Sequence, residues 1–438
     1  MAQEIERVVE RALKDRRRLG HVDLGAIEFE VRESVHGIGR VLLEQLLQGE
    51  HGHCGPRLDC GQGHQAEFVS YRTKQLSTVL GSVELCRAYY HCASCARGLI
   101  PKDAELDVVD TSFSPGARRL MARVGAQEPF EAGRQDLAEL AGVQVQTKEV
   151  ERISEQCGQQ IEQAAGKERV ALRAGKVVPL KAESVLYIAI DGTGVPVVPR
   201  ELEGREGKEG KPKTREAKLA CVFTQTTVDA NGYAVRDPGS TSYVGAIETA
   251  AAFGPRAKAE AVRRGLQQAT RVVVLGDGAP WIWNLATEQF PDAVHIVDLY
   301  HAREHLAGLG KLVYGVGSAE AKAWTAARVD DLDEGQVDAV VYAIGQLPAT
   351  TETAREQARK DTDYFQTNSV RMCYQYFRNQ GFFVGSGAIE AGCKTVVGQR
   401  LKQSGMRWTV DGANAVIALR CWLLSDRWQE FWMNRAAS

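Results

Sequence analysis

Three carboxylates lie at positions where the sequence predicts that a buried strand ends or a helix begins. Asp191 ends the apolar run ESVLYIAID and Asp277 ends VVVLGD, and a glycine follows each. Active sites of α/β sheets usually lie at the carboxyl ends of buried strands. Glu390 lies in the first turn of an expected helix, after a Gly-Ser-Gly triplet. Asp-Gly pairs also make plain turns or helix caps, so only the three together indicate a catalytic site.

The residues after Glu390 add positive charge and an aromatic ring. Lys394 follows Glu390 by four residues and therefore shares its helix face. A metal-dependent nuclease needs a carboxylate for magnesium, cations for phosphates and a ring for an unpaired base. A solvated amphipathic helix is the alternative. The predicted DNA contacts are Lys394, Arg400, Lys402, Arg407 and Trp408.

Acids from two strands and a helix can build a two-metal site. Magnesium prefers oxygen ligands, and two ions about 3.5 to 4 Å apart hold the attacking and leaving oxygens of a phosphodiester in line. We expect two Mg²⁺ (or Mn²⁺) ions on Asp191, Asp277 and Glu390. Asp298 and His301, at the end of the next strand and the start of a helix, are expected to support this site. His301 and His305 are one turn apart and could bind a metal, but a network at the helix start is the preferred interpretation.

Half of the ten cysteines fall in one short stretch, which in a reducing compartment indicates metal before disulfides. Cys92 and Cys95 form a CxxC pair, the shape of a zinc knuckle. Two further ligands must come from upstream, and the alternative is a set of reduced, unligated thiols. We expect a structural zinc. The candidate partner pairs are, in order of preference, Cys60 with His64 and His51 with Cys54.

The apolar pattern changes several times along the chain, which predicts several regions. Alternating strands and helices in the second half indicate a mixed α/β sheet. Regions 1–50, 111–175 and 311–380 are expected to be helical, 51–110 a zinc-ribbon-like β region, 176–310 the catalytic core and 381–438 the C-terminal catalytic helices.

Two local features refine these regions. Gly81-Ser82 is the expected turn of a hairpin in the β region. In 111–175, two helices joined by GVQVQ have the outline of a helix-turn-helix that would read DNA, although any packed helical hairpin looks similar.

Length and charge limit the function classes. At 438 residues the chain predicts two to four domains. It has no run of 18 apolar residues and starts with a charged helical pattern, so we expect a cytoplasmic protein without a membrane partner. The net charge of −2 excludes a histone-like binder but permits local basic patches. Candidate patches are KDRRR near residue 16, the loop at 208–218 and the run from 394 to 407.

The order IDGTGVP, VLGDGAPWIW, DLYH, a long helical stretch, GSGAIEAGCK and KQSGMRW resembles the DDE transposases of bacterial insertion sequences, and more narrowly the ISKra group. GQGHQAEFVSYR, RAYYHCASCARGLIPKD and ELAGVQVQTKEVER extend the resemblance over most of residues 50 to 438. Relatives often carry two CxxC-like pairs, whereas this chain offers histidine or wider spacing at the first.

The resemblance implies a ribonuclease-H-like core in which Asp191, Asp277 and Glu390 are the acidic triad and Asp298 to His301 match a C/D-x-x-H signature. It also implies that 311–380 is a helical insertion in that core. It implies cleavage at transposon ends by water, followed by attack of the freed 3′-hydroxyl on target DNA, with no covalent enzyme intermediate. The implied partners are the terminal inverted repeats, the target DNA and further copies of the chain on that DNA. The implied location is the cytoplasm, on the bacterial nucleoid when bound.

Three other functions fit parts of this pattern. A ribonuclease-H-like nuclease or resolvase would share the triad but only cut, and it would need no end-binding region. A non-catalytic DNA-binding descendant of a transposase would not need intact acids. A glycoside hydrolase would also use two carboxylates, but the cations after Glu390 and the lack of an aromatic-rich sugar groove disfavour it.

Overall fold

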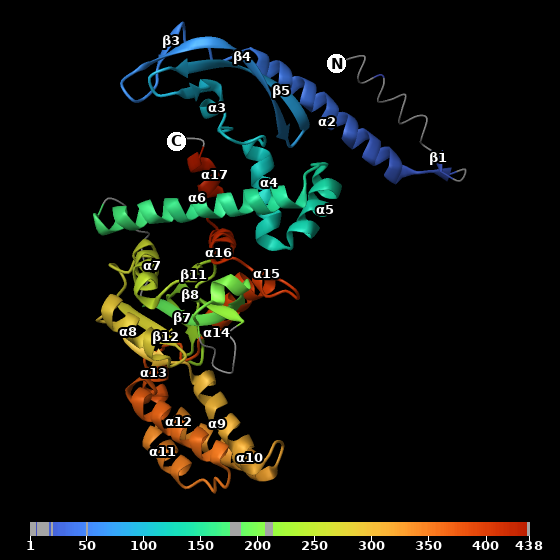
Figure 1. The fold of residues 1–438 in the computed structure, drawn as a ribbon. Helices are drawn as coiled ribbons and strands as arrows, with labels where there is room; N and C mark the ends of the chain where they lie inside the picture. Colours follow the sequence, from blue (N-terminus) through green and yellow to red (C-terminus); the bar gives the residue numbers. More distant parts are fainter. Residues whose placement is uncertain are drawn as a thin grey trace. The chain divides into compact units, whose positions relative to one another are not determined.

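A computed structural model describes residues 6, 17–18, 21–49, 51–175, 185–205 and 213–435 (Figure 1). The chain divides into two compact units, Met1–Cys157 with Gln429–Ser438, and Gly158–Trp428. Most of the helical pattern expected before residue 21, most of KDRRR and part of the 208–218 loop lie outside the described residues. Within the described part, no helix is long and apolar enough to cross a membrane.

The first unit contains a four-stranded antiparallel sheet in the order β3-β4-β5-β6. The turn of its long hairpin lies at Val79-Leu80, not at the predicted Gly81-Ser82: Thr78 pairs with Gly81, whose φ of +108° suits the first position after the turn. The elements here are β1 (Arg17–Arg18), β2 (His21–Val22), α2 (Leu24–Gln48), β3 (Arg57–Asp59), β4 (Gln65–Thr78), β5 (Gly81–Cys92) and β6 (Arg97–Leu99).

Helices follow this sheet. Ser114 caps α4 by accepting a hydrogen bond from the Ala117 N–H (3.1 Å), and Pro115 occupies the first helical position. Gly142, at φ +67°, ends α5 in the left-handed conformation. The helices are α3 (Pro101–Glu105), α4 (Pro115–Gln127), α5 (Phe130–Ala141), α6 (Thr147–Arg173), which crosses the boundary between the units, and α17 (Trp428–Arg435).

The second unit is built on a five-stranded mixed sheet in the order β11-β8-β7-β12-β13, so the predicted mixed α/β sheet is confirmed. β7, β8 and β11 are antiparallel, whereas β7, β12 and β13 are parallel. Residues 185–190 of β7 are all buried, as a central strand covered on both faces requires. The strands are β7 (Val185–Pro196), β8 (Thr214–Gln225), β11 (Ser242–Ala246), β12 (Arg271–Gly276) and β13 (Val294–Val297), with a small pair β9 (Thr227–Val228) and β10 (Ala234–Val235).

Helices flank this sheet, and α9 to α12 gather at one end of the unit (Figure 1). Residues 316–380 form separate helices rather than the continuous helical stretch expected, and the expected last helix is broken at Asp426, where φ is +58°. The helices are α7 (Ala250–Arg263), α8 (Pro280–Gln289), α9 (Leu299–Tyr314), α10 (Ala319–Asp333), α11 (Val337–Gly345), α12 (Glu352–Asn368), α13 (Tyr374–Asn379), α14 (Gly387–Gly392), α15 (Gln399–Leu401) and α16 (Val410–Leu424), with short turns η1 (Pro199–Leu202), η2 (Ser369–Arg371) and η3 (Cys393–Gly398).

Candidate active site and metal centre

Three aspartates lie side by side at one edge of the mixed sheet, because the parallel strands beneath them are in register. Leu275 of β12 lies opposite Ala189 of β7, so the next side chain on that face, Asp277, is level with Asp191. β13 continues the pattern, and Asp298 directly follows its last residue. The sheet thus brings these three predicted residues to one place.

Asp191 lies in a partly buried, negatively charged setting. Its Oδ1 accepts a hydrogen bond from the Gly192 N–H (2.6 Å), and its Oδ2 accepts one from the Cys393 thiol (3.3 Å). Burial, and to a lesser degree the charge of Asp277, raise the pKa of Asp191 above its ordinary value. Two carboxylates that are partly shielded from solvent favour a bound cation. Their oxygen atoms are the ligands that magnesium prefers.

Asp277 is held through both its side chain and its backbone carbonyl. Its Oδ1 accepts a hydrogen bond from the Ala279 N–H (2.9 Å), and its carbonyl accepts one from the Tyr364 hydroxyl (3.0 Å). Tyr364 lies directly over Gly278, where a Cβ atom would approach its ring to 2.5 Å. Burial and nearby carboxylates raise the pKa of Tyr364, so its hydroxyl stays protonated and donates.

Asp298 is fully buried and uses both carboxylate oxygens within the protein. Its Oδ1 accepts from the His301 N–H (2.7 Å) at the start of α9, and its Oδ2 accepts from the Ser386 N–H. Asp298 therefore joins the sheet edge to the segment that leads into α14, the helix of Glu390. These two contacts form a hydrogen-bonded network at the start of α9.

The segment before α14 is held over the sheet by aromatic contacts. The Tyr187 ring stacks on Phe223 (centroids 4.8 Å apart, 4° between planes) and meets Phe383 edge-on at 5.3 Å. The Tyr187 hydroxyl accepts a hydrogen bond from the Phe383 N–H (3.3 Å), and the Leu299 N–H donates to the Val384 carbonyl (2.9 Å). The chain is thereby fixed on the face that carries the aspartates.

Glu390 is exposed on α14, and its helix approaches Asp191 directly. Cys393 follows Glu390 by three residues, on the same side of the helix, and its thiol contacts Asp191. Gly392 allows this approach, because a Cβ atom there would come within 2.7 Å of the Tyr243 ring. The structure thus brings the end of α14, the helix of Glu390, to the strand that carries Asp191.

A turn of π-helix, η3, continues α14. Arg420, which is buried on α16, donates to the carbonyls of Thr395 and Val396 (2.7 Å to the latter) in this turn. π-turns occur often at functional sites, and this one leaves carbonyls that need an outside donor. Arg420 therefore stabilises the distorted helix that follows Glu390.

The side chains of Asp191, Asp277 and Glu390 do not form a closed group of metal ligands. Among the described residues, the group of His, Cys, Asp or Glu side chains close enough to hold a metal ion is the cysteine–histidine group of the first unit, whose ligand atoms lie within 4.8 Å of one another. Asp191, Asp277 and Glu390 are the residues that would hold magnesium here, with oxygen ligands of the kind this ion prefers.

The predicted DNA contacts divide into exposed and buried residues. Lys394, Lys402 and Arg407 are exposed, and the Lys402 ammonium contacts the Thr193 hydroxyl on β7. Arg400 is fully buried, and the Trp408 side chain is 7% exposed. The prediction that these last two contact DNA directly is therefore corrected, because phosphates and bases cannot reach them in this fold.

Arg400 and Trp408 instead stabilise the end of the site. The Arg400 guanidinium lies 5.0 Å from the centre of the Trp408 ring, and the indole N–H donates to the Leu401 carbonyl (3.1 Å). The Trp408 backbone pairs with the end of β7, through its N–H to the Pro196 carbonyl (3.1 Å). The chain after η3 is thus hydrogen-bonded to β7, the strand that carries Asp191.

His301 and His305 lie near the aspartates at the start of α9. Their rings meet edge-on at 5.1 Å, and the His305 ring stacks on Tyr364 at 4.2 Å. His305 Nδ1 lies 2.8 Å from the buried carboxylate of Asp361 on α12. The second histidine is thus part of a network that supports Tyr364, and His301 faces the site at its exposed edge.

The first unit holds a second ligand cluster. Cys60, His64, Cys92 and Cys95 place their ligand atoms within 4.8 Å of one another, so this group can hold a metal such as zinc. The loop between β3 and β4 supplies Cys60 and His64, the last residue of β5 is Cys92, and the loop after β5 supplies Cys95. Cys95 Sγ lies 3.1 Å from His64 Nδ1 and 3.6 Å from Cys60 Sγ.

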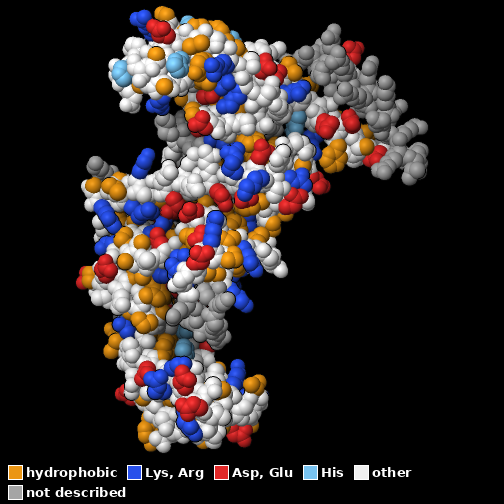
Figure 2. Space-filling view, viewed as in Figure 1, with side chains coloured by type: hydrophobic (Ala, Val, Ile, Leu, Met, Phe, Trp, Pro, Cys, Tyr) orange, Lys and Arg blue, Asp and Glu red, His pale blue; other side chains and the backbone are white. Residues whose placement is uncertain are grey.

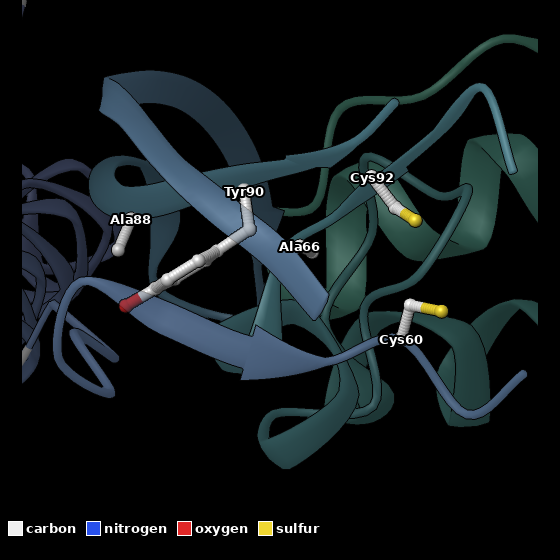
Figure 3. Packing of buried hydrophobic residues seen from close by; sticks show 5 residues of the cluster. All are labelled: Cys60, Ala66, Ala88, Tyr90 and Cys92. Atoms are coloured by element: carbon white, nitrogen blue, oxygen red, sulfur yellow. The ribbon is translucent and has the colours of Figure 1, made fainter. Parts of the chain in front are cut away.

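The cluster sits at the end of a small apolar core. Figure 3 shows the sulfur atoms of Cys60 and Cys92 at one end of this core and the Tyr90 ring pointing to the other. Burial raises the pKa of Cys95 to about 11. Burial acts in the same direction on Cys60, but hydrogen bonds to the backbone of Gln62 and His64 lower its pKa overall.

The second-choice pair lies elsewhere. His51 stands edge-on to Tyr71 at 5.5 Å, and the exposed Cys54 directs its thiol to the Gly52 carbonyl (3.6 Å). Neither residue belongs to the four-ligand group.

Removal of the CxxC pair tests the metal centre. We expect about one zinc per chain by elemental analysis, as a closed structural site binds one ion. Cys92→Ser with Cys95→Ser should abolish this zinc and lower the unfolding temperature, because metal binding stabilises the fold around it. Cys54→Ser is the matched control and should keep the zinc. Equal zinc contents in all three proteins would refute the site.

Sequence reasoning missed three residues that shape the acidic site: Cys393, Tyr364 and Arg420. Cys393 has the one available signal, its position three residues after Glu390 on the same helix face. Tyr364 and Arg420 come from distant helices, so no local pattern connects them with the aspartates.

Comparisons with known proteins give little further guidance. No protein-family model matches the chain, and no curated protein matches it significantly. Among solved structures, the Drosophila P element transposase strand transfer complex is similar at a TM-score of 0.31 and 9% sequence identity, over 74% of this chain and 94% of that chain. At this TM-score the likeness carries no argument about function.

Proposed function

We propose that this protein is a DDE transposase of a bacterial insertion sequence, of the ISKra group, with a ribonuclease-H-like catalytic core. It binds the terminal inverted repeats of its element, cleaves a DNA strand there and transfers the freed end to target DNA. Copies of the chain act together on that DNA. The observation that carries the proposal is the alignment of Asp191, Asp277 and the helix of Glu390 at one edge of a mixed sheet.

Each acidic residue has a separate position in this mechanism. Asp191 and Asp277, on adjacent parallel strands, would hold magnesium from the sheet side, and Glu390 would do so from the helix side. Magnesium held there would supply Lewis-acid chemistry for activating water and stabilising charge on the phosphodiester oxygens. Asp298 and Tyr364 position these groups without joining the reaction.

Exposed cations provide the DNA contacts of the catalytic unit. Lys394, Lys402 and Arg407 follow Glu390 on the surface, and Lys402 reaches the strand of Asp191. On the face shown in Figure 2, basic and acidic side chains are interspersed, as the net charge of −2 leads one to expect. Phosphate binding therefore depends on this local group rather than on a basic surface. The zinc-ribbon-like sheet and helices α5 and α6 are proposed to hold the transposon ends.

One experiment tests the whole proposal. The purified chain is incubated with Mg²⁺, a plasmid carrying the reading frame with its genomic flanks, and a second plasmid as target. We expect cleavage at the inverted repeats and joining of their 3′ ends to the target, and neither in EDTA. Cleavage without joining would indicate a nuclease that only cuts, and no cleavage would contradict the proposal. In the genome, inverted repeats and short direct duplications should flank the reading frame.

A further inference from the structure

A pocket of about 840 Å³ lies beside α14, within the second unit. Ala388 and Ala391 of α14 line it, and Glu390 of the same helix does not. Its volume is within the range of sites that bury a ligand of nucleotide size. The acidic triad as proposed does not use this pocket.

Aromatic side chains form much of its wall. Tyr300 comes from the start of α9, Tyr233 from the turn before β10, and Phe382 and Phe383 from the segment that leads to α14. Tyr300 is 59% exposed and Tyr233 61% exposed, so both rings have faces open to a ligand. Flat, exposed rings around an apolar floor suit a flat ligand that stacks.

The charged residues of the pocket favour an anionic ligand. Arg236 is exposed, with its guanidinium 5.9 Å from the centre of the Phe223 ring. Arg378 lies 3.6 Å from Asp333, the acidic residue of the lining, which also pairs with Arg303 outside it. Because two arginines balance Asp333, the positive charge of Arg236 remains for a phosphate.

The position of the pocket relates it to the strand being cut. Tyr300 lies between Asp298 and His301 in the chain, and its ring packs against Gly385, where a Cβ atom would approach to 2.7 Å. Helix α9 and the loop before α14 thus contribute to both the pocket and the acidic site. A DNA strand that passes Glu390 would therefore also pass the helix and the loop that line this pocket.

We propose that this pocket holds an unpaired base of the DNA strand next to the cleaved phosphate. Tyr300 and Tyr233 stack on the base, and Arg236 binds its phosphate. An enzyme that takes a base out of the duplex gains binding energy from such stacking and fixes the position of the neighbouring bond. The inference rests on the proposed function, because it takes the strand at Glu390 to be the substrate.

Fluorescence titration tests it. The probe is a single-stranded dT 12-mer with one central 2-aminopurine, and the comparison is the blunt duplex of the same sequence. We expect quenching of 2-aminopurine in the wild-type complex. Tyr300→Ala and Arg236→Ala should each weaken single-strand binding about tenfold, in the range found when one stacking or phosphate contact is removed. Duplex binding should change little, and Tyr300→Phe should restore both affinity and quenching.

Matched controls lie outside the pocket. Tyr376→Ala removes a tyrosine that is 61% exposed on α13, and Arg359→Ala removes an exposed arginine on α12. Both should bind the probe as the wild type does. Unchanged affinity in the Tyr300 and Arg236 variants, or equal losses in the controls, would overturn the proposal. Pocket-dependent binding without any magnesium-dependent cleavage by the wild type would refute the proposed function while leaving the base site in place.

Discussion

Asp191→Asn, Asp277→Asn and Glu390→Gln should each reduce magnesium-dependent strand cleavage by at least about 10³-fold. Each change replaces a charged carboxylate with a neutral amide of the same shape, which is a poor ligand for magnesium. Cleavage of an end-labelled inverted-repeat duplex measures the effect, and binding of the same DNA without metal should persist. Full activity in any of the three would remove that residue from the triad.

Asp292→Asn is the matched control, because this exposed aspartate precedes β13 at the opposite end of the strand. It should cut DNA as the wild type does. Equal losses in the control would show that charge alone, rather than position, accounts for the effect.

The stability of Asp191→Asn separates lost chemistry from lost folding. Burial raises the folded pKa of Asp191 above its unfolded value, so the stability that its protonated form contributes is lost as the pH rises through the folded pKa. At neutral pH in EDTA the charged carboxylate therefore costs stability. Asp191→Asn should unfold at the same or a higher temperature than the wild type, measured by differential scanning calorimetry without metal.

Asp298→Ala should destabilise the second unit by roughly 2 to 5 kcal/mol and also abolish cleavage. It removes a helix cap, which costs about 0.5 to 2 kcal/mol, and it leaves the buried Ser386 N–H without its acceptor, which costs about 1 to 3 kcal/mol. The loop that leads to Glu390 then loses its link to the sheet. Urea unfolding at pH 7 measures the first effect, and the cleavage assay measures the second.

Ser318→Ala is the control for capping alone. Ser318 caps α10: its hydroxyl accepts a hydrogen bond from the Ala321 N–H (3.0 Å) and donates one to the nearby Gly315 carbonyl (3.1 Å). It should cost only about 1 kcal/mol and leave cleavage intact. If Asp298→Ala cost no more than Ser318→Ala, Asp298 would be only a helix cap.

The sequence identified the positions that depend on local pattern. A run of apolar residues that ends in aspartate and glycine predicts a buried strand with a carboxylate at its end, and the structure has Asp191 and Asp277 so placed, side by side. Short spacings within one loop also identified Cys60 with His64 and Cys92 with Cys95, which the structure brings together. In both cases neighbours in the chain stay neighbours in the fold.

Burial of the basic run was not predictable in the same way. Arg400 and Lys402 look alike in sequence, but one is fully buried under Trp408 and the other is exposed beside Thr193. The helix changes its pitch at η3, so a period of 3.6 residues assigns the wrong faces after it. Only the packing of α16, through Arg420, determines that turn.

The level arrangement of the aspartates also makes the acidic site depend on correct strand pairing. Side chains alternate between the faces of a strand, so a slip of β12 by a single residue would turn Asp277 to the far side of the sheet. A chain with that error keeps its hydrophobic strands and its cations, but Asp277 no longer lies level with Asp191. Under the proposed function, such a copy would lack the paired carboxylates that hold magnesium, so DNA scission would be confined to molecules whose strand pairing is correct.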